Sequence, residues 1–257
     1  MGLKLTSIQI ENPGAPKLVI LHGLMGNSRN WAQVGKELSG RFEVHLLDLR
    51  NHGYSPWADS MAWAELSSDI LDYLEAHACN ESIDLLGHSL GGKIALHFTA
   101  HHPELIRKLV VVDIAPKRYK PHFKKAFEAL LSMPIETIKT RQEASDFLLS
   151  EIPDLQFRES LLANLRRDGA GYTWLPNLLA LYNNQEIIRT NPLVDGARID
   201  GATLLIKGGA SDFIVEGDLP SIRALIPKVE LITMEAVGHN PHTEDRETLV
   251  DLLLAWL

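Results

Sequence analysis

Residues 85–96 read LLGHSLGGKIAL, and this stretch decides the fold. Its centre, residues 87–91, has the form glycine–X–serine–X–glycine. The apolar run SIDLL at 82–86 precedes it, and a helical pattern follows at 91–101. A serine between two glycines at a turn from strand to helix is presented above the end of the strand, where its hydroxyl can attack a substrate. The pattern therefore predicts that Ser89 is a nucleophile.

The two glycines of this stretch have a steric explanation. A turn this tight strains the backbone at the serine, and side chains two residues to either side would collide, so glycine is needed at Gly87 and Gly91. The first turn of the following helix would point N–H groups toward negative charge developing near the serine. A glycine-rich turn without chemistry is the competing interpretation, and the strand before and the helix after the motif disfavour it.

On both sides of this stretch, short apolar runs alternate with helical patterns along much of the chain. Runs of this length and continuity are typical of strands buried on both faces; they are residues 17–21, 42–49, 82–86, 108–114, 202–207 and 229–234. Helical spacing of apolar residues covers 63–76, 91–101 and 243–257. This alternation predicts an α/β fold with a mostly parallel central sheet flanked by helices.

Residues 116–200 break the alternation and read as helices over 121–133, 136–152, 154–168 and 175–189, with no convincing buried strand. The segment is rich in aromatic residues, most of which we expect to form its own core. We predict a core made of residues 1–115 and 201–257, with 116–200 as a helical cap over the sheet.

A serine nucleophile needs a base within hydrogen-bond reach, and 11 histidines are available. His239 follows the last strand-like run and precedes the last helix, which places it at the carboxyl edge of the sheet with Ser89. His242 is the competitor, and we expect it to flank the last helix. The side chain of His88 should point away from Ser89, and His97 should lie on the surface of its helix or at the helix end. We therefore predict His239 as the base.

The acid that orients this base has two candidates, because Asp113 and Asp212 both follow predicted strands. The later strand is the commoner place for the acid, which favours Asp212. However, Ser211 occupies the position where that acid is expected. We therefore prefer Asp113, with Ser211 as a second hydrogen-bond partner of His239. Asp212 stays open as the alternative, or as a turn or cap residue.

The oxyanion of an acyl-transfer reaction needs backbone N–H donors. The residue after the nucleophile, Leu90, supplies one. The loop after the first core strand, His22 to Gly26, can turn back over the site through its glycines. Leu24 is our choice for the second donor, and an ordinary glycine-rich turn is the alternative.

Composition excludes several other classes of protein. The chain has 257 residues, a formal charge of −8 and one cysteine, Cys79. The negative charge disfavours nucleic acid and anionic membrane surfaces as partners, and one cysteine fits a reducing compartment. With neither a signal-peptide pattern nor a bilayer-length apolar run, we expect a soluble cytoplasmic protein. His45, Asp48 and His52 imply no fixed ligand geometry, so we expect no metal, and no cofactor is needed. The oligomeric state cannot be predicted.

Several stretches together resemble the α/β-hydrolase superfamily, in particular the YbfF-type esterases and the abhydrolase-domain-11 proteins. They are LHGLMGNSRNW at 21–31, DLRNHGYSP at 48–56, LLGHSLGGKIAL at 85–96, LVVVDIAP at 109–116, KGGASDFI at 207–214 and VGHNPH at 237–242. The resemblance covers nearly the whole chain. It implies a serine hydrolase with a helical cap that acts on small-molecule carboxylic esters, or on acyl-CoA thioesters. It also implies an acid at Asp113, with Ser211 near His239, and the presence of Asp212 departs from the pattern.

Two other functions remain open because this fold hosts varied chemistry. A lyase or a C–C bond-cleaving enzyme on the same triad would want a polar or cationic cap for a charged substrate, and Arg50, Lys93 and Arg118 could supply it. A binding protein could also keep the triad residues. Dehalogenase and epoxide-hydrolase activities need an aspartate at position 89 and are rejected.

Overall fold

The computed structural model describes residues 2–77, 79, 81–169, 171–193 and 196–257. Seven strands form the main sheet in the order β1-β3-β2-β4-β5-β8-β9. Their bounds are β1 Ser7–Ile10, β2 Lys17–Leu21, β3 Glu43–Leu47, β4 Ile83–His88, β5 Ile106–Val112, β8 Thr203–Gly208 and β9 Val229–Met234. β1 pairs with β3 in the antiparallel sense, and every other pairing in this sheet is parallel. The predicted α/β fold class is therefore confirmed.

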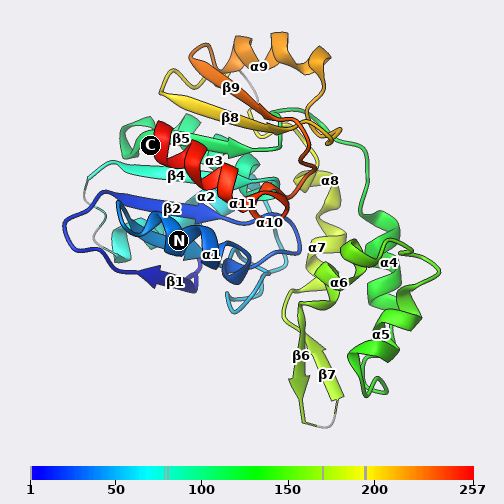
Figure 1. The fold of residues 1–257 in the computed structure, drawn as a ribbon. Helices are drawn as coiled ribbons and strands as arrows, with labels where there is room; N and C mark the ends of the chain where they lie inside the picture. The colour runs from blue at the N-terminus through cyan, green and yellow to red at the C-terminus, as the bar shows by residue number, and fades with distance from the viewer. Residues whose placement is uncertain (1, 78, 80, 170, 194–195) are drawn as a thin grey trace.

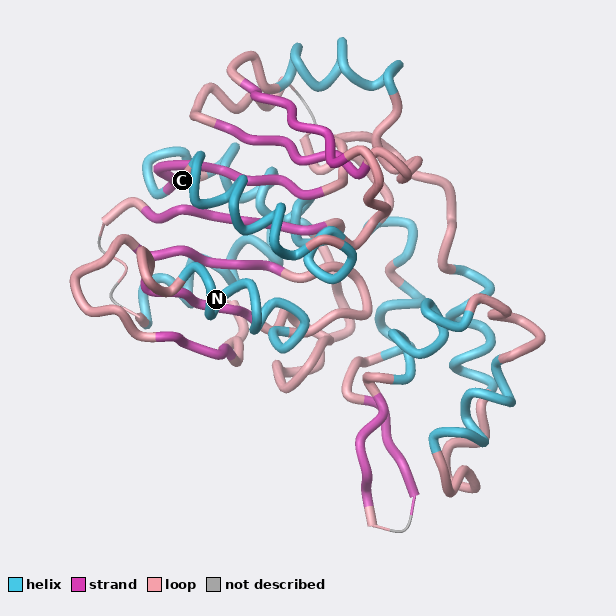
Figure 2. The backbone as a smooth tube through the Cα atoms, in the orientation of Figure 1, coloured by secondary structure: helices cyan, strands magenta, loops and turns pink. Residues whose placement is uncertain are grey.

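Alternation along the strands builds a core on each face of this sheet. In β2, Val19 and Leu21 belong to one buried cluster, whereas Leu18 and Ile20 belong to the other. Side chains of a strand point to opposite faces in turn, so a continuously apolar strand can bury both faces only if helices cover both. This requirement explains the layered arrangement in Figures 1 and 2.

The helices divide between the two faces of the sheet. α1 (Ala32–Leu38) and α11 (Arg246–Trp256) contribute to one core cluster, and α2 (Trp63–Ala76), α3 (Leu90–His101) and α9 (Leu219–Leu225) contribute to the other (Figure 1). A short helix, α10 (Pro241–Glu244), precedes α11. Three 3-10 turns complete this part of the chain, at Ser28–Trp31, Pro103–Leu105 and Glu216–Asp218. Among the described residues, no helix combines the length and the apolar content needed to cross a bilayer.

A separate group of elements lies beyond the carboxyl ends of the strands (Figure 1). These elements are α4 Lys124–Ser132, α5 Arg141–Leu148, α6 Leu155–Leu162, β6 Leu165–Asp168, β7 Gly171–Trp174, α7 Leu178–Asn183 and α8 Gln185–Ile188. Buried residues such as Phe127 and Leu162 join them to the core cluster that contains α2 and α3. Phe127, an aromatic residue of this segment, thus belongs to the core that also contains α2 and α3, and not to a separate core of the segment.

The predicted helix over 154–168 is wrong in its second half. The helix ends at Leu162, and Leu165–Asp168 is a strand that pairs with Gly171–Trp174 in an antiparallel hairpin (Figure 2). Arg166, Arg167 and Asp168 give a helix no apolar face to bury, whereas Leu165 pairs with Trp174 in the hairpin. Gly169, with φ +56°, adopts the left-handed backbone that a tight turn requires.

Candidate active site

Ser89 lies at the turn between β4 and α3, in a backbone conformation that few non-glycine residues adopt. Its φ is +51° and its ψ is −117°. A Cβ atom at Gly87 would lie 2.3 Å from the carbonyl oxygen of Gly91, and one at Gly91 would lie 2.4 Å from that of Leu21. Real Cβ atoms do not tolerate such approaches, so both positions need glycine. Close packing on both sides thus holds the strained serine at the end of its strand.

A chain of hydrogen bonds links Ser89 to two residues that are distant in sequence. The Oγ of Ser89 lies 3.0 Å from Nε2 of His239, and Nδ1 of His239 lies 2.8 Å from Oδ2 of Asp113. Asp113 has no exposed surface, and Ser89 is 7% exposed. A buried carboxylate beside Nδ1 favours the tautomer that leaves Nε2 free to accept a proton from the serine. This arrangement can activate a hydroxyl for nucleophilic attack.

Asp113 also accepts hydrogen bonds that do not involve the histidine. Its Oδ1 accepts from the N–H of Gly208 at 2.9 Å, and its Oδ2 accepts from Oγ of Ser211 at 2.5 Å. Ser211 therefore contacts the carboxylate, whereas we had predicted it as a partner of His239. Asp212 is exposed, and none of the hydrogen bonds among the described residues uses its carboxylate. The geometry thus brings Asp113, and not Asp212, to the histidine.

Several contacts position His239 that were not predicted from the sequence. The ring of Phe213 stacks on it, with centroids 3.7 Å apart and an interplanar angle of 12°. Glu244 accepts from the N–H groups of Gly238 and Asn240, which flank the histidine. His88 bonds through Nε2 to the carbonyl oxygen of His239 at 2.7 Å. The only sequence signal for Phe213 was its place in the quoted stretch at 207–214.

The two other histidine predictions fare differently. His242 lies in α10, just before the last helix, where its buried ring stacks on Trp31 at 4.6 Å. His97 is not on the surface, because it is 9% exposed and its Nδ1 lies 2.6 Å from Oγ of Ser67 on α2. The prediction for His97 fails because α2 packs on that face of α3.

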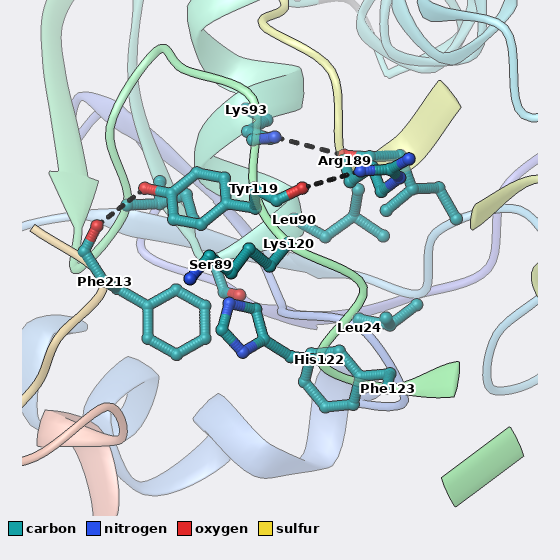
Figure 3. Close-up of a pocket in the computed structure, with 12 residues that line it drawn as sticks. Leu24, Ser89, Leu90, Lys93, Tyr119, Lys120, His122, Phe123, Arg189 and Phe213 are labelled. Carbon is teal, nitrogen blue, oxygen red and sulfur yellow. Dashed lines mark hydrogen bonds between the residues drawn. The ribbon is translucent and has the colours of Figure 1, made fainter. Parts of the chain in front are cut away.

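Two backbone N–H groups near Ser89, those of Leu24 and Leu90, donate none of the hydrogen bonds found among the described residues. Leu90 is the first residue of α3, so its N–H has no partner within the helix. The N–H groups of Gly91 and Met25 are engaged, by the carbonyl of His22 and by Nε2 of His52 respectively. Leu24 and Leu90 both line an opening beside Ser89 (Figure 3). The binding of an oxyanion by these two N–H groups stays a prediction.

Two buried neutral histidines support this loop. His22 bonds through Nδ1 to the carbonyl of Gly23 and accepts at Nε2 from Leu49 N–H. His52 bonds through Nδ1 to the carbonyl of Arg50 and accepts at Nε2 from Met25 N–H. Burial lowers the pKa of His22 to about 4 and that of His52 to about 3. Each ring therefore uses both nitrogens while it carries no charge.

We expect acid to destabilise the fold through these two rings. Because their pKa values in the folded state lie below the ordinary 6.5, the unfolded chain binds more protons between that value and about 4, so stability falls as pH falls through this window. From pH 7.5 to 5.5, each ring should cost about 1 kcal/mol of unfolding free energy. Urea unfolding of the wild type and of His52→Gln at both pH values measures this. An equal loss in the two proteins would contradict the assignment.

The residues considered for a metal have other partners. His45 bonds to Tyr73 and Glu43, and Asp48 accepts from the backbone N–H groups of Ser28 and Tyr54. His52 holds the loop described above. In the part of the chain that the structure describes, no cluster of three or more histidine, cysteine or acidic side chains could hold a metal ion.

The three cations noted in the sequence lie in different places. Arg50 is buried and pairs with Asp69 through Nε at 2.6 Å and a terminal nitrogen at 2.8 Å. Arg118 pairs with Glu186 on the surface. Lys93 is buried on α3 and lines the opening beside Ser89, where Figure 3 shows it near Tyr119. A cationic group next to the serine is thus provided by Lys93.

Two openings meet at Ser89. The first, which we call the inner pocket, takes in about 410 Å³, part of it open to solvent, and is lined by Leu24, Ser89, Leu90, Lys93, Ile114, Tyr119, Lys120, His122, Phe123, Ile188, Arg189 and Phe213. The second, the wide cleft, encloses about 1590 Å³, part of it open to solvent, and runs along the His22–Gly26 loop, α6 and the loop of His239. Both openings include Ser89, and they also share Leu24, His122, Phe123 and Phe213 as lining residues.

The chain is similar to known proteins in sequence and in structure. Residues 16–245 match the family model described as the alpha/beta hydrolase fold. The chain is 30% identical to the sn-1-specific diacylglycerol lipase ABHD11 of Danio rerio, over 93% of this chain and 78% of that protein. It is 26% identical to esterase YbfF of Escherichia coli, over 100% and 98%. Among solved structures, a marine microorganism esterase superposes with a TM-score of 0.94 at 34% identity, covering 99% of this chain and 100% of that one.

Proposed function

Since the chain belongs to the alpha/beta hydrolase fold family, we propose that it is a serine hydrolase that cleaves carboxylic esters through an acyl-enzyme on Ser89. Family membership does not by itself establish the reaction. The observation that carries the proposal is the unbroken series of hydrogen bonds from Ser89 through His239 to Asp113. The names of the ester-cleaving relatives support the same class of substrate.

The proposed reaction has two halves. Ser89 Oγ attacks the acyl carbonyl while Nε2 of His239 takes its proton, and the N–H groups of Leu24 and Leu90 bind the oxyanion. The histidine then gives the proton to the leaving alcohol, and the acyl group stays on the serine. Water, deprotonated by the same histidine, attacks the acyl-enzyme. The second oxyanion then collapses, the bond from the acyl carbon to Ser89 Oγ breaks, and His239 returns the proton to Oγ as the acid is released. Asp113 stabilises the imidazolium in both halves.

The same steps apply to thioesters, because a thiolate can replace the alkoxide as leaving group. We therefore extend the proposal to acyl-CoA thioesters, for which the wide cleft offers room beside Ser89 and His239. Residues 116–200, as a cap, would supply one wall of both openings through His122 and Phe123.

A fluorophosphonate probe tests the nucleophile directly. We expect the wild type to be labelled at one residue, Ser89, identified by mass spectrometry of the digested protein, because the probe reacts with activated serines. The labelled protein should lose its activity on p-nitrophenyl acetate and butyrate in step with labelling. A parallel panel of acyl-CoA thioesters shows whether the activity extends to thiol leaving groups.

The remaining outcomes separate the rival functions. Labelling without hydrolysis of any ester or thioester favours a lyase or a C–C bond-cleaving enzyme on the same residues. A protein that is neither labelled nor active would be a binding protein, and the proposal would be rejected.

A further inference from the structure

The inner pocket and the wide cleft carry opposite charges. Among the described residues that line the inner pocket, the charged ones are Lys93, Lys120 and Arg189, and none is acidic. Among those that line the wide cleft, Asp154 and Glu244 are acidic, and none is lysine or arginine. Both openings include Ser89, so this difference in charge can direct the acyl group and the leaving group of a substrate into different openings.

Lys93 is the cation that a ligand in the inner pocket would find with the least competition from water. It is 2% exposed, and its Nζ donates to the carbonyl oxygens of Thr190 at 2.7 Å and Ile188 at 3.2 Å. Tyr119 presents its ring face at 4.7 Å. These two bonds use two of the three N–H donors of an ammonium, and the structure shows no third hydrogen bond of Nζ among the described residues.

Lys93 has no carboxylate partner in the part of the chain that the structure describes. Among the described residues, the ion pairs within 4.0 Å do not include Lys93. Lysine is rarely buried without a charged partner, because an ammonium loses its hydration there. The same burial, with Arg118 and Lys117 nearby, lowers the pKa of Lys93 to about 7. A bound anion would supply the missing partner and favour the charged form.

The position of His239 decides which half of an ester enters each opening. In the proposed reaction the leaving group must accept a proton from Nε2 of His239. His239 lines the wide cleft and is absent from the described lining of the inner pocket. The leaving group therefore belongs in the wide cleft, and the acyl group belongs in the inner pocket.

We propose that the inner pocket selects acyl groups that end in a carboxylate, which Lys93 binds, so that the preferred substrates are half-esters of short dicarboxylic acids. The inference rests on the proposed function and deepens it. The backbone N–H of Lys93 donates to the carbonyl oxygen of Ser89 at 3.1 Å, so the two residues lie one helical turn apart, which suits an acyl chain of a few carbons. The apolar lining, including Leu24, Leu90 and Ile114, would contact the methylene groups between the two carboxyl carbons.

The test compares monoethyl glutarate with ethyl 5-methylhexanoate, in which an isopropyl group replaces the carboxylate. Ethanol release by NMR gives kcat/KM for each. We expect the wild type to prefer the half-ester by about 10- to 100-fold, the range expected of a hydrogen bond to a charged group in a buried site. In Lys93→Met this ratio should fall at least tenfold. In Lys125→Met, which alters an exposed lysine on α4 outside the inner pocket, the ratio should stay at the wild-type value.

A lysine that serves only as a strut between α3 and residues 188–190 would give another result. Lys93→Met would then weaken both activities equally, and an unchanged ratio would overturn the proposal. The wild-type ratio is a second measurement that needs no variant, and a value of one or below also overturns it. If the wild type cleaves the neutral ester and is labelled at Ser89, such a failure concerns the substrate alone. If it neither cleaves an ester nor is labelled, the proposed function itself has failed.

Discussion

Replacing Ser89 by alanine is expected to abolish ester hydrolysis while the protein stays folded. The hydroxyl is the proposed nucleophile. Without it, His239 has no group to deprotonate, and no acyl-enzyme can form. Because triad residues act as a unit, kcat should fall by about 10⁴- to 10⁶-fold. The small activity that remains would come from the oxyanion donors. Initial rates on p-nitrophenyl butyrate, with a fluorophosphonate labelling assay on the same sample, measure this loss.

The fold of this variant should be unaffected, since alanine removes one oxygen and keeps the Cβ atom. Circular dichroism and thermal unfolding check that expectation. Ser132→Ala is the matched control, because it removes an exposed hydroxyl on α4 whose one hydrogen bond among the described residues is to the carbonyl of Ala129. A Ser89→Ala protein with more than a few per cent of wild-type activity would show that another nucleophile performs the reaction.

The pair Asp113→Asn and Asp212→Asn should differ greatly in activity. Asparagine at 113 preserves shape but removes the charge that stabilises the imidazolium, and its amide can favour the wrong histidine tautomer. The expected loss in kcat is about 10⁴-fold. Asparagine at 212 alters an exposed side chain with none of the hydrogen bonds shown among the described residues, so kcat should stay within about twofold of the wild type.

If Asp212 is the acid, the activities of the two variants will be reversed. A large loss in Asp212→Asn together with an active Asp113→Asn would mean that the loop after β8 rearranges in solution to bring Asp212 to His239. Because Asp113 also bonds to Ser211 and to the N–H of Gly208, unfolding of both variants in urea should accompany the kinetics. A folded but inactive Asp113→Asn separates catalysis from stability.

Much of the sheet could be predicted because its signals are local. Residues 17–21 and 229–234 were predicted with the bounds that β2 and β9 have, and 63–76 matches α2. A continuously apolar strand or an amphipathic helix carries its own periodicity, which is visible in a few neighbouring residues. β1 was missed because its four residues at the edge of the sheet are only half-buried and follow no clear pattern.

Within residues 116–200, the helices were predicted better than their ends. β6 falls within a stretch predicted as helix, and β7 falls between two predicted helices, because the hairpin depends on the pairing of Leu165 with Trp174, nine residues later. Propensity within one segment does not contain that contact, and tertiary pairing overrides it. The division into a core and a cap at 115 and 200 remains a prediction.

The sequence alone determined that a serine stands at a strained turn between two glycines, and that a histidine follows the last strand of a parallel sheet. Both conclusions depend on residues adjacent in the chain, whose steric limits act at short range. Only the tertiary structure decided that Asp113 reaches His239 while Asp212 faces solvent. It also placed Lys93 in the pocket of the serine, with no carboxylate partner among the described residues. The carboxyl ends of neighbouring parallel strands all meet at one edge, so chain order cannot tell which side chain turns inward; packing in three dimensions makes that choice.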